Sequence, residues 1–150
     1  LRRFNQSYER NIPEDQLIDL TVTLESTLLA DHDNELTYRL AVRGAALLAD
    51  MGAPWEPRKS RASLTAMYAV RSSIVHSGQQ LSDQKVLNKI RNIGIQPKDF
   101  PQQCERIVRD ILKTYVQRKA NGQSVRQINQ ELETRIVDGL GAQMSLTDAS

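Results

Sequence analysis

Apolar residues recur every three or four positions along most of the chain, the spacing that places them on one face of an α-helix. Pro13 and the two acidic residues after it suit the first turn of a helix, and the apolar residues that follow predict a helix over about 14–30. A second helix follows Asn34, whose side chain can cap it by accepting a backbone N–H. Gly44 lies within this second helix, where glycine costs about 1 kcal/mol relative to alanine. We therefore expect a neighbouring helix to approach closely at Gly44.

Glycine and proline residues interrupt the helical pattern in the next segment and predict a loop over 49–60. A third helix then runs to Ser77 and Gly78, a pair typical of a helix C-terminus. A shorter helix begins at Ser82 and ends near Gly94.

Two more helices complete the pattern. A long one is predicted over about 99–119. Ser124 and Gln127 have the spacing of a capping box and introduce a last helix over about 125–138. No segment alternates apolar and polar residues in the manner of a strand. The predicted fold class is therefore all-α, a bundle of four to five main helices plus a short helix, with its core over about 14–120.

The composition fits one globular domain over 1–150, with 39% hydrophobic and 25% charged residues. No stretch is apolar enough to cross a membrane, so we expect a soluble protein without a membrane partner. The sequence starts at Leu1 rather than Met, and we expect an upstream region that carries other domains of a longer protein. Cys104 is the lone cysteine and has no disulfide partner, which favours the reducing cytoplasm.

Charge is distributed unevenly along the chain. Residues 58–126 hold 14 basic and 4 acidic residues, a net charge of +10, whereas 1–57 and 127–150 carry net charges of −5 and −3. Such asymmetry is typical of a surface that meets phosphate, although hydrated Lys and Arg on helix faces explain it equally well.

One short segment carries residues suited to chemistry. Arg71 precedes His76 by five positions at the end of the third predicted helix. That spacing places the two side chains about 140° apart on a regular helix, whereas Ser72 and His76 share a face. Arg71 and His76 can therefore converge only if the helix loosens near Gly78 or if a second copy of the domain brings its own pair.

The string R-S-S-I-V-H-S-G over 71–78 resembles the R-x4-6-H motif of HEPN domains, the higher eukaryote and prokaryote nucleotide-binding superfamily. The phrases L-I-D-L over 17–20 and E-L-T-Y-R-L-A-V-R-G-A over 35–45, followed by Tyr68, are similar to the ApeA-like branch of that superfamily. The resemblance covers roughly residues 14–120 by motif order and helical pattern.

The resemblance implies a helical bundle that forms a homodimer in which the two motifs face one another. Many such domains are metal-independent endoribonucleases of defence or toxin-like systems, and they need no cofactor. In this chemistry the 2′-hydroxyl of the RNA attacks the neighbouring phosphorus and leaves a cyclic phosphate and a free 5′-hydroxyl. The implied catalytic residues are His76 for proton transfer, Arg71 for the phosphate charge and Ser72 for orienting His76.

Other interpretations of the same residues remain open. A HEPN module can bind RNA or nucleotide without cleaving it, or it can only dimerise and dock a partner. An unrelated helical scaffold would make the motif accidental. Arg71 and His76 would then cap carbonyls of their helix and pair with a buried acid. Glu25 lies on an apolar stripe and predicts a buried ion pair for which Arg43 is a candidate. His32, flanked by two aspartates, is a weak metal candidate and is more simply a solvated loop residue.

Overall fold

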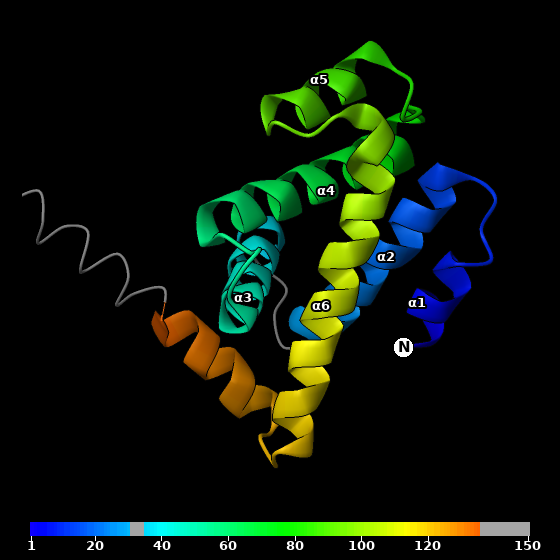
Figure 1. Ribbon diagram of the computed structural model, residues 1–150. Coiled ribbons are helices and arrows are strands. Elements are labelled where there is room, and N and C mark those ends of the chain that lie inside the picture. The colour runs from blue at the N-terminus through cyan, green and yellow to red at the C-terminus, as the bar shows by residue number, and fades with distance from the viewer. Residues whose placement is uncertain (31–34, 136–150) are drawn as a thin grey trace, which may run out of the picture.

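The computed structural model describes residues 1–30 and 35–135. Its regular structure in these ranges is entirely helical, which confirms the predicted all-α class (Figure 1). The elements are α1 (Arg2–Ser7), α2 (Pro13–Leu28), α3 (Leu36–Met51), α4 (Pro57–Ser77), α5 (Gln84–Asn92), the one-turn 3-10 helix η1 (Pro97–Asp99), α6 (Phe100–Ala120) and a helix over 125–135 that we call the terminal helix.

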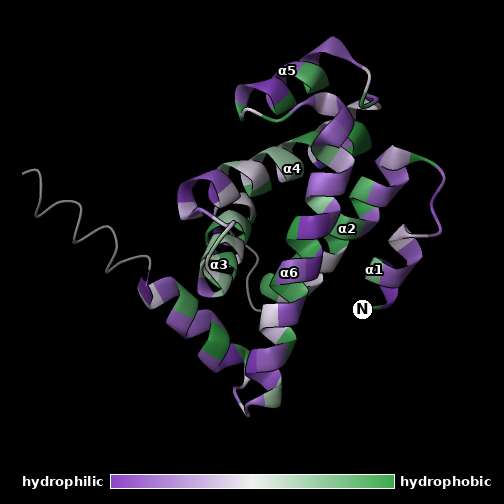
Figure 2. Cartoon of the chain, in the orientation of Figure 1, coloured by the Kyte–Doolittle hydropathy of each residue, from purple (hydrophilic) through white to green (hydrophobic). Residues whose placement is uncertain are grey.

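Helices α2, α3, α4 and α6 surround the core, with the most extensive contact between α3 and α4. Helix α5 packs on α4, and α1 packs on α2 (Figure 1). Hydrophobic and hydrophilic residues alternate in bands along the main helices (Figure 2), and the buried apolar residues of these helices form one core cluster. The fully buried core residues come from all four helices and include Leu20, Leu24, Leu40, Leu48, Leu64, Met67, Val108 and Ile111.

Helix α4 differs from its prediction at the start and agrees with it at the end. The preceding loop covers only 52–56 and not 49–60, because Pro57 occupies the first turn of α4, where no backbone N–H is needed. Gly78 adopts a left-handed conformation with φ of 61°, and its N–H donates to the carbonyl of Ile74 at 3.1 Å. Helix α4 therefore stops at the predicted Ser77–Gly78 pair.

The close approach predicted at Gly44 is confirmed. A Cβ atom at this position would lie 2.7 Å from Cδ1 of Leu64 on α4 and 3.1 Å from Cδ1 of Ile111 on α6. Glycine in the middle of α3 thus allows two neighbouring helices to approach the backbone.

Helix α1 is an element that the apolar pattern does not predict, because Phe4 is its only large apolar residue. Its position depends on Asp19 of α2, whose buried carboxylate accepts hydrogen bonds from Arg3 at 2.9 Å and from Arg10 at 2.8 Å. Burial alone raises the pKa of the Asp19 carboxyl, but the hydrogen bonds from Arg10 and Arg3 outweigh it and hold that pKa below its ordinary value. A long-range ion-pair cluster therefore fixes the N-terminal segment.

The terminal helix begins with the predicted capping box. The Ser124 N–H donates to Oε1 of Gln127 at 2.8 Å, and the Gln127 N–H donates to Oγ of Ser124 at 3.2 Å. Ile128 and Leu132 of this helix are buried. Its predicted end near 138 lies outside the described residues, as do the predicted cap Asn34 and the metal candidate His32.

Ion pairs join the terminal helix to α3 and α6. Asp50 at the end of α3 accepts from Arg118 at 2.6 Å and from Arg135. Fully buried Arg43 donates to the carbonyl of Leu28 and to Glu133. Within residues 1–30 and 35–135, no helix combines the length and hydropathy that crossing a bilayer demands.

Candidate active site on α4

Arg71 lies on the side of α4 that faces α2. Its side chain is 19% exposed, and Nη2 lies 3.8 Å from Oε2 of Glu25. The buried Nε of Arg71 has no hydrogen-bond partner. A guanidinium carries five N–H donors, and this long ion pair leaves most of them available. Arg71 therefore lies beside Glu25 while it retains donors for an anionic ligand.

His76 lies in the last turn of α4 and is exposed. In the part of the chain that the structure describes, its ring makes no hydrogen bond or ion pair, and Ser72 does not bond to it. Ser72 is half-buried one turn earlier on the same face. The imidazole is thus accessible for proton transfer, whereas the orienting bond from Ser72 is not formed in this state.

Arg71 and His76 do not meet within one chain. Helix α4 is continuous through Ser77, so the two side chains keep the separation of about 140° that five helical residues impose. The expected alternative of a helix loosened near Gly78 is therefore not observed. The arc of surface between Arg71 and His76 carries Val75, Tyr68 and Ser72, and Val75 is 46% exposed.

Ser73 is a residue of this region that sequence reasoning missed. It is buried, donates to the carbonyl of Ala69 at 3.0 Å, and accepts a hydrogen bond from Nζ of Lys89 on α5. The bond joins two residues separated by 16 positions, and no local sequence pattern indicates it. Lys89 is thereby fixed beside the segment that holds Arg71 and His76.

The pair predicted between Glu25 and Arg43 is wrong. Glu25 faces α4 and pairs with Arg71, whereas Arg43 faces the end of α2 and the terminal helix and pairs with Glu133. The suggestion that Arg71 pairs with an acid is confirmed, although Glu25 is 25% exposed rather than fully buried. The periodic pattern places both residues inward but does not say which neighbour each one meets.

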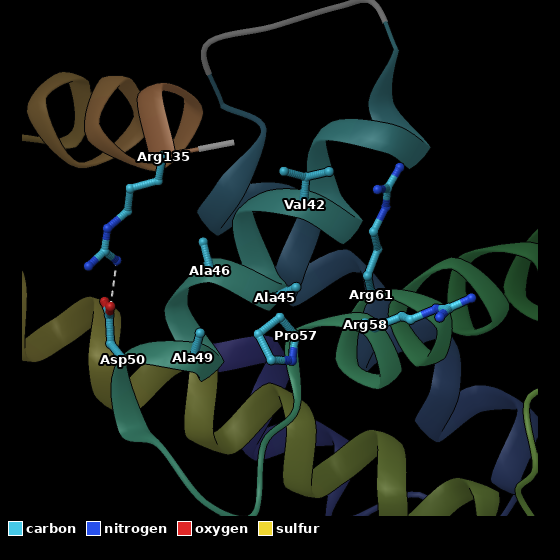
Figure 3. Close-up of a pocket in the computed structure, with 9 residues that line it drawn as sticks. All are labelled: Val42, Ala45, Ala46, Ala49, Asp50, Pro57, Arg58, Arg61 and Arg135. Atoms are coloured by element: carbon cyan, nitrogen blue, oxygen red, sulfur yellow. Dashed lines mark hydrogen bonds and ion pairs between the residues drawn. The ribbon is translucent and has the colours of Figure 1, made fainter. Parts of the chain in front are cut away.

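A hollow of about 810 Å³ opens between α3, the start of α4 and the terminal helix (Figure 3). Val42 and small alanines of α3 form its apolar wall, and Arg58, Arg61 and Arg135 lie around it. Arg135 points to Asp50, while Arg58 and Arg61 diverge from the first turns of α4 without an interaction to another residue drawn (Figure 3).

No three His, Cys, Asp or Glu side chains gather into a metal site within residues 1–30 and 35–135. Cys104 is buried inside α6, and burial raises the pKa of its thiol above the ordinary value. A buried, protonated thiol is a poor nucleophile, so Cys104 is a core residue.

Comparisons of the chain with protein-family models, with curated proteins and with solved structures give no match. Its function must therefore be argued from the motif and from the geometry of α4.

Proposed function

We propose that this chain is a HEPN-type, metal-independent endoribonuclease that acts as a homodimer, as the effector part of a defence or toxin-like protein. The observation that carries the proposal is the arrangement of α4, with an arginine that lies beside a glutamate and retains free donors, followed five positions later by an exposed histidine that has no partner among the described residues. These groups suit phosphate binding and proton transfer respectively.

The geometry favours a site shared between two copies. On one unbroken helix, Arg71 and His76 are too far apart in angle to reach the same phosphate. The arc between them holds the exposed apolar side chain of Val75, a surface suited to contact with a second α4. A two-fold axis beside this arc would bring two arginines and two histidines around one cleft.

The reaction requires no group beyond the RNA and these side chains. The 2′-hydroxyl oxygen forms a bond to phosphorus and loses its proton, the bond from phosphorus to the 5′-oxygen breaks, and that oxygen gains a proton. His76 moves these protons across the interface, and Arg71 stabilises charge on the phosphate oxygens. Ser72 lies on the face of His76 and orients the ring once the dimer closes.

The test is cleavage of labelled single-stranded RNA by the 150-residue chain in the presence of a chelator. We expect products that end in a cyclic phosphate and a 5′-hydroxyl, and their loss in His76→Ala and Arg71→Ala. His32→Ala is the matched control because it removes the other histidine of the chain. Arg109→Ala is the control for Arg71, since Arg109 is also a partly buried arginine in an ion pair with a glutamate. Wild-type activity in either motif variant contradicts the proposal.

Sharing across the interface has its own test. A mixture of Arg71→Ala and His76→Ala chains contains dimers with one intact arginine and one intact histidine on opposite chains. Restored cleavage in the mixture supports a shared site. If mixed dimers form and no activity returns, either each copy must supply its own pair or both pairs are needed together.

A second candidate is an RNA-binding HEPN module without cleavage. The missing bond between Ser72 and His76 favours it, since the ring is not oriented in the single chain. Binding of RNA without any cleavage product at high protein concentration identifies this alternative.

A further inference from the structure

Arginine residues of this chain fall into two groups. Most have a carboxylate partner, and these are Arg3, Arg10, Arg39, Arg43, Arg71, Arg109, Arg118 and Arg135. In the ranges the structure covers, the other arginines have no carboxylate partner, and these are Arg2, Arg58, Arg61, Arg91, Arg106 and Arg126. Of these, Arg58 and Arg61 lie at the start of α4, and their side chains make no hydrogen bond or ion pair with a described residue. The guanidinium of Arg61 lies over the ring of Tyr38, 5.2 Å from its centroid. Stacking occupies the face of the Arg61 guanidinium and leaves its N–H donors at the edge, so both arginines keep donors for a ligand.

Arg58 and Arg61 stand between two hollows. One is the hollow beside α3, and the other is a groove of about 490 Å³ between α4 and α5. Lys89 and Asn92 of α5 line the groove opposite Arg58, Arg61 and Thr65 of α4, over a floor of small residues that comprises Ala62, Ala66 and Ala69. Among the described residues that line the groove there is no carboxylate, so its charged groups are all positive.

The groove continues the face of α4 that carries His76. An outward stripe of residues at helical spacing runs along α4 and ends at His76. Its members, at successive intervals of seven, four, three and four positions, are Arg58, Thr65, Ala69, Ser72 and His76. The stripe is about 27 Å long at 1.5 Å per residue, which is long enough for several nucleotides. The positive charge of Arg58 thus lies at one end of the stripe, and the proton-transfer group His76 lies at the other.

We propose that the α4–α5 groove is a track for single-stranded RNA, in which Arg58, Arg61 and Lys89 bind successive phosphates and direct the strand toward His76. This inference rests on the proposed ribonuclease function. The arginine forks match phosphate oxygens, and Asn92 adds a neutral donor for the sugar and phosphate groups. The Thr65 hydroxyl donates to the Arg61 carbonyl at 2.9 Å, so its oxygen is left to accept from a ribose hydroxyl. The hydrogen bond from Lys89 to Ser73 fixes the ammonium at the groove wall before RNA arrives. Repeated charge along a groove favours RNA over a compact acidic protein.

The experiment measures binding separately from cleavage. Labelled single-stranded RNA is titrated by fluorescence anisotropy with the His76→Ala chain, which cannot cleave it under the proposal. The double variant Arg58→Glu with Arg61→Glu is compared with Lys119→Glu with Arg126→Glu, which changes the charge equally at exposed residues at the far end of α6 and the start of the terminal helix. Circular dichroism checks that both are folded. If the groove reversal fails to fold, Arg58→Gln with Arg61→Gln gives the same comparison.

We expect the groove variant to bind about tenfold more weakly or worse, and its salt dependence to flatten by about 0.7 in log–log slope for each phosphate that the protein no longer neutralises. The control should change by less than about twofold. Equal losses in both variants, or unchanged binding in the groove variant, overturn the track.

Two further outcomes separate the hypotheses. In one outcome, a glutamate-rich peptide binds through Arg58 and Arg61 and RNA does not bind. The groove is then a protein-docking surface, and the track is overturned. In a second outcome, RNA binding depends on the groove arginines, but the chain with native His76 does not cleave the RNA. This result supports the track and contradicts the proposed ribonuclease activity.

Discussion

Two regions of the molecule use basic residues in opposite ways. On the paired side, where α2, α3 and the terminal helix meet, arginines have carboxylate partners, and Arg43 of α3 is fully buried between Leu28 and Glu133. On the open side, along the outer face of α4, Arg58, Arg61 and His76 have no carboxylate partner in the ranges that the structure describes. The contrast teaches that the net charge of the basic stretch is a poor guide to ligand binding. What decides binding is which of its basic side chains already have a carboxylate partner.

The difference has an energetic consequence. A buried charge that loses its partner is costly, whereas an exposed charge is already hydrated and contributes little to folding. Substitutions on the paired side should therefore change stability, and substitutions on the open side should change binding.

The largest effect is expected at Arg43. Arg43→Met retains a long, unbranched side chain but removes the guanidinium. The Leu28 carbonyl and Glu133 then lose the hydrogen bonds that Arg43 donates. We expect the free energy of unfolding in urea to fall by about 3 kcal/mol. Arg58→Met, the matched change on the open side, should stay within about 0.5 kcal/mol. Similar losses in both variants contradict the division of the molecule into a paired side and an open side.

Gly44 gives the next largest effect, because it tests close packing without charge. Gly44→Val inserts a branched side chain where a Cβ alone would lie 2.7 Å from Leu64. We expect a loss of about 2 kcal/mol in thermal or urea unfolding, since a buried leucine has limited room to move. Ala49→Val, at an exposed position of the same helix, isolates the cost of branching and should lose about 0.5 kcal/mol. If Gly44→Val leaves the free energy of unfolding unchanged, α4 and α6 can move away from α3 at little cost, and the close-packing account is wrong.

Much of the fold is predictable from sequence because the helices follow local rules. The positions of Pro13, Gly78 and Ser124 mark helix ends through backbone geometry that neighbouring residues alone decide. Helix α1 escapes prediction because its support is the contact of Arg3 and Arg10 with Asp19, which exists only after the chain has folded back.

The candidate site is less predictable than the fold. Periodicity correctly placed Arg71 and His76 on different faces of one helix, but it did not identify Glu25 as the neighbour of Arg71. The bond from Lys89 to Ser73 and the groove beside Arg58 depend on how α5 lies on α4, which is tertiary information. The spacing of residues in the sequence therefore predicts which helix face a side chain lies on. Which residue it contacts is known only from the packed structure.

A smaller effect, dependent on pH, is expected at Asp19. The pKa of this carboxyl is lowered in the folded state, so its stabilising contribution is present above the unfolded pKa of about 3.9 and is lost as pH falls through the folded value. Asp19→Asn should lower stability by about 1 kcal/mol at pH 7, because both arginine partners are half exposed. The gap from the wild type should shrink as the pH falls below the unfolded pKa and through the lower, folded one. Asp99→Asn, at an exposed aspartate, is the control, and a gap that persists in acid contradicts the ion-pair account.

The smallest effect comes from two adjacent serines at the boundary between the two sides. Ser73→Ala removes the bonds to Lys89 and Ala69. Ser72→Ala removes a hydroxyl that has no hydrogen bond to any described residue of the single chain. Alanine gains about 0.5 kcal/mol of helix propensity at either position, and the lost hydrogen bond costs about 1 kcal/mol at Ser73 alone. Ser73→Ala should therefore be less stable than Ser72→Ala by about 1 kcal/mol in urea unfolding. RNA cleavage should show the reverse order, because Ser72 orients His76 in the proposed dimer and Ser73 only positions Lys89. If Ser73→Ala loses more cleavage than Ser72→Ala at equal folded fraction, the orienting role belongs to the bond between α4 and α5 and not to Ser72.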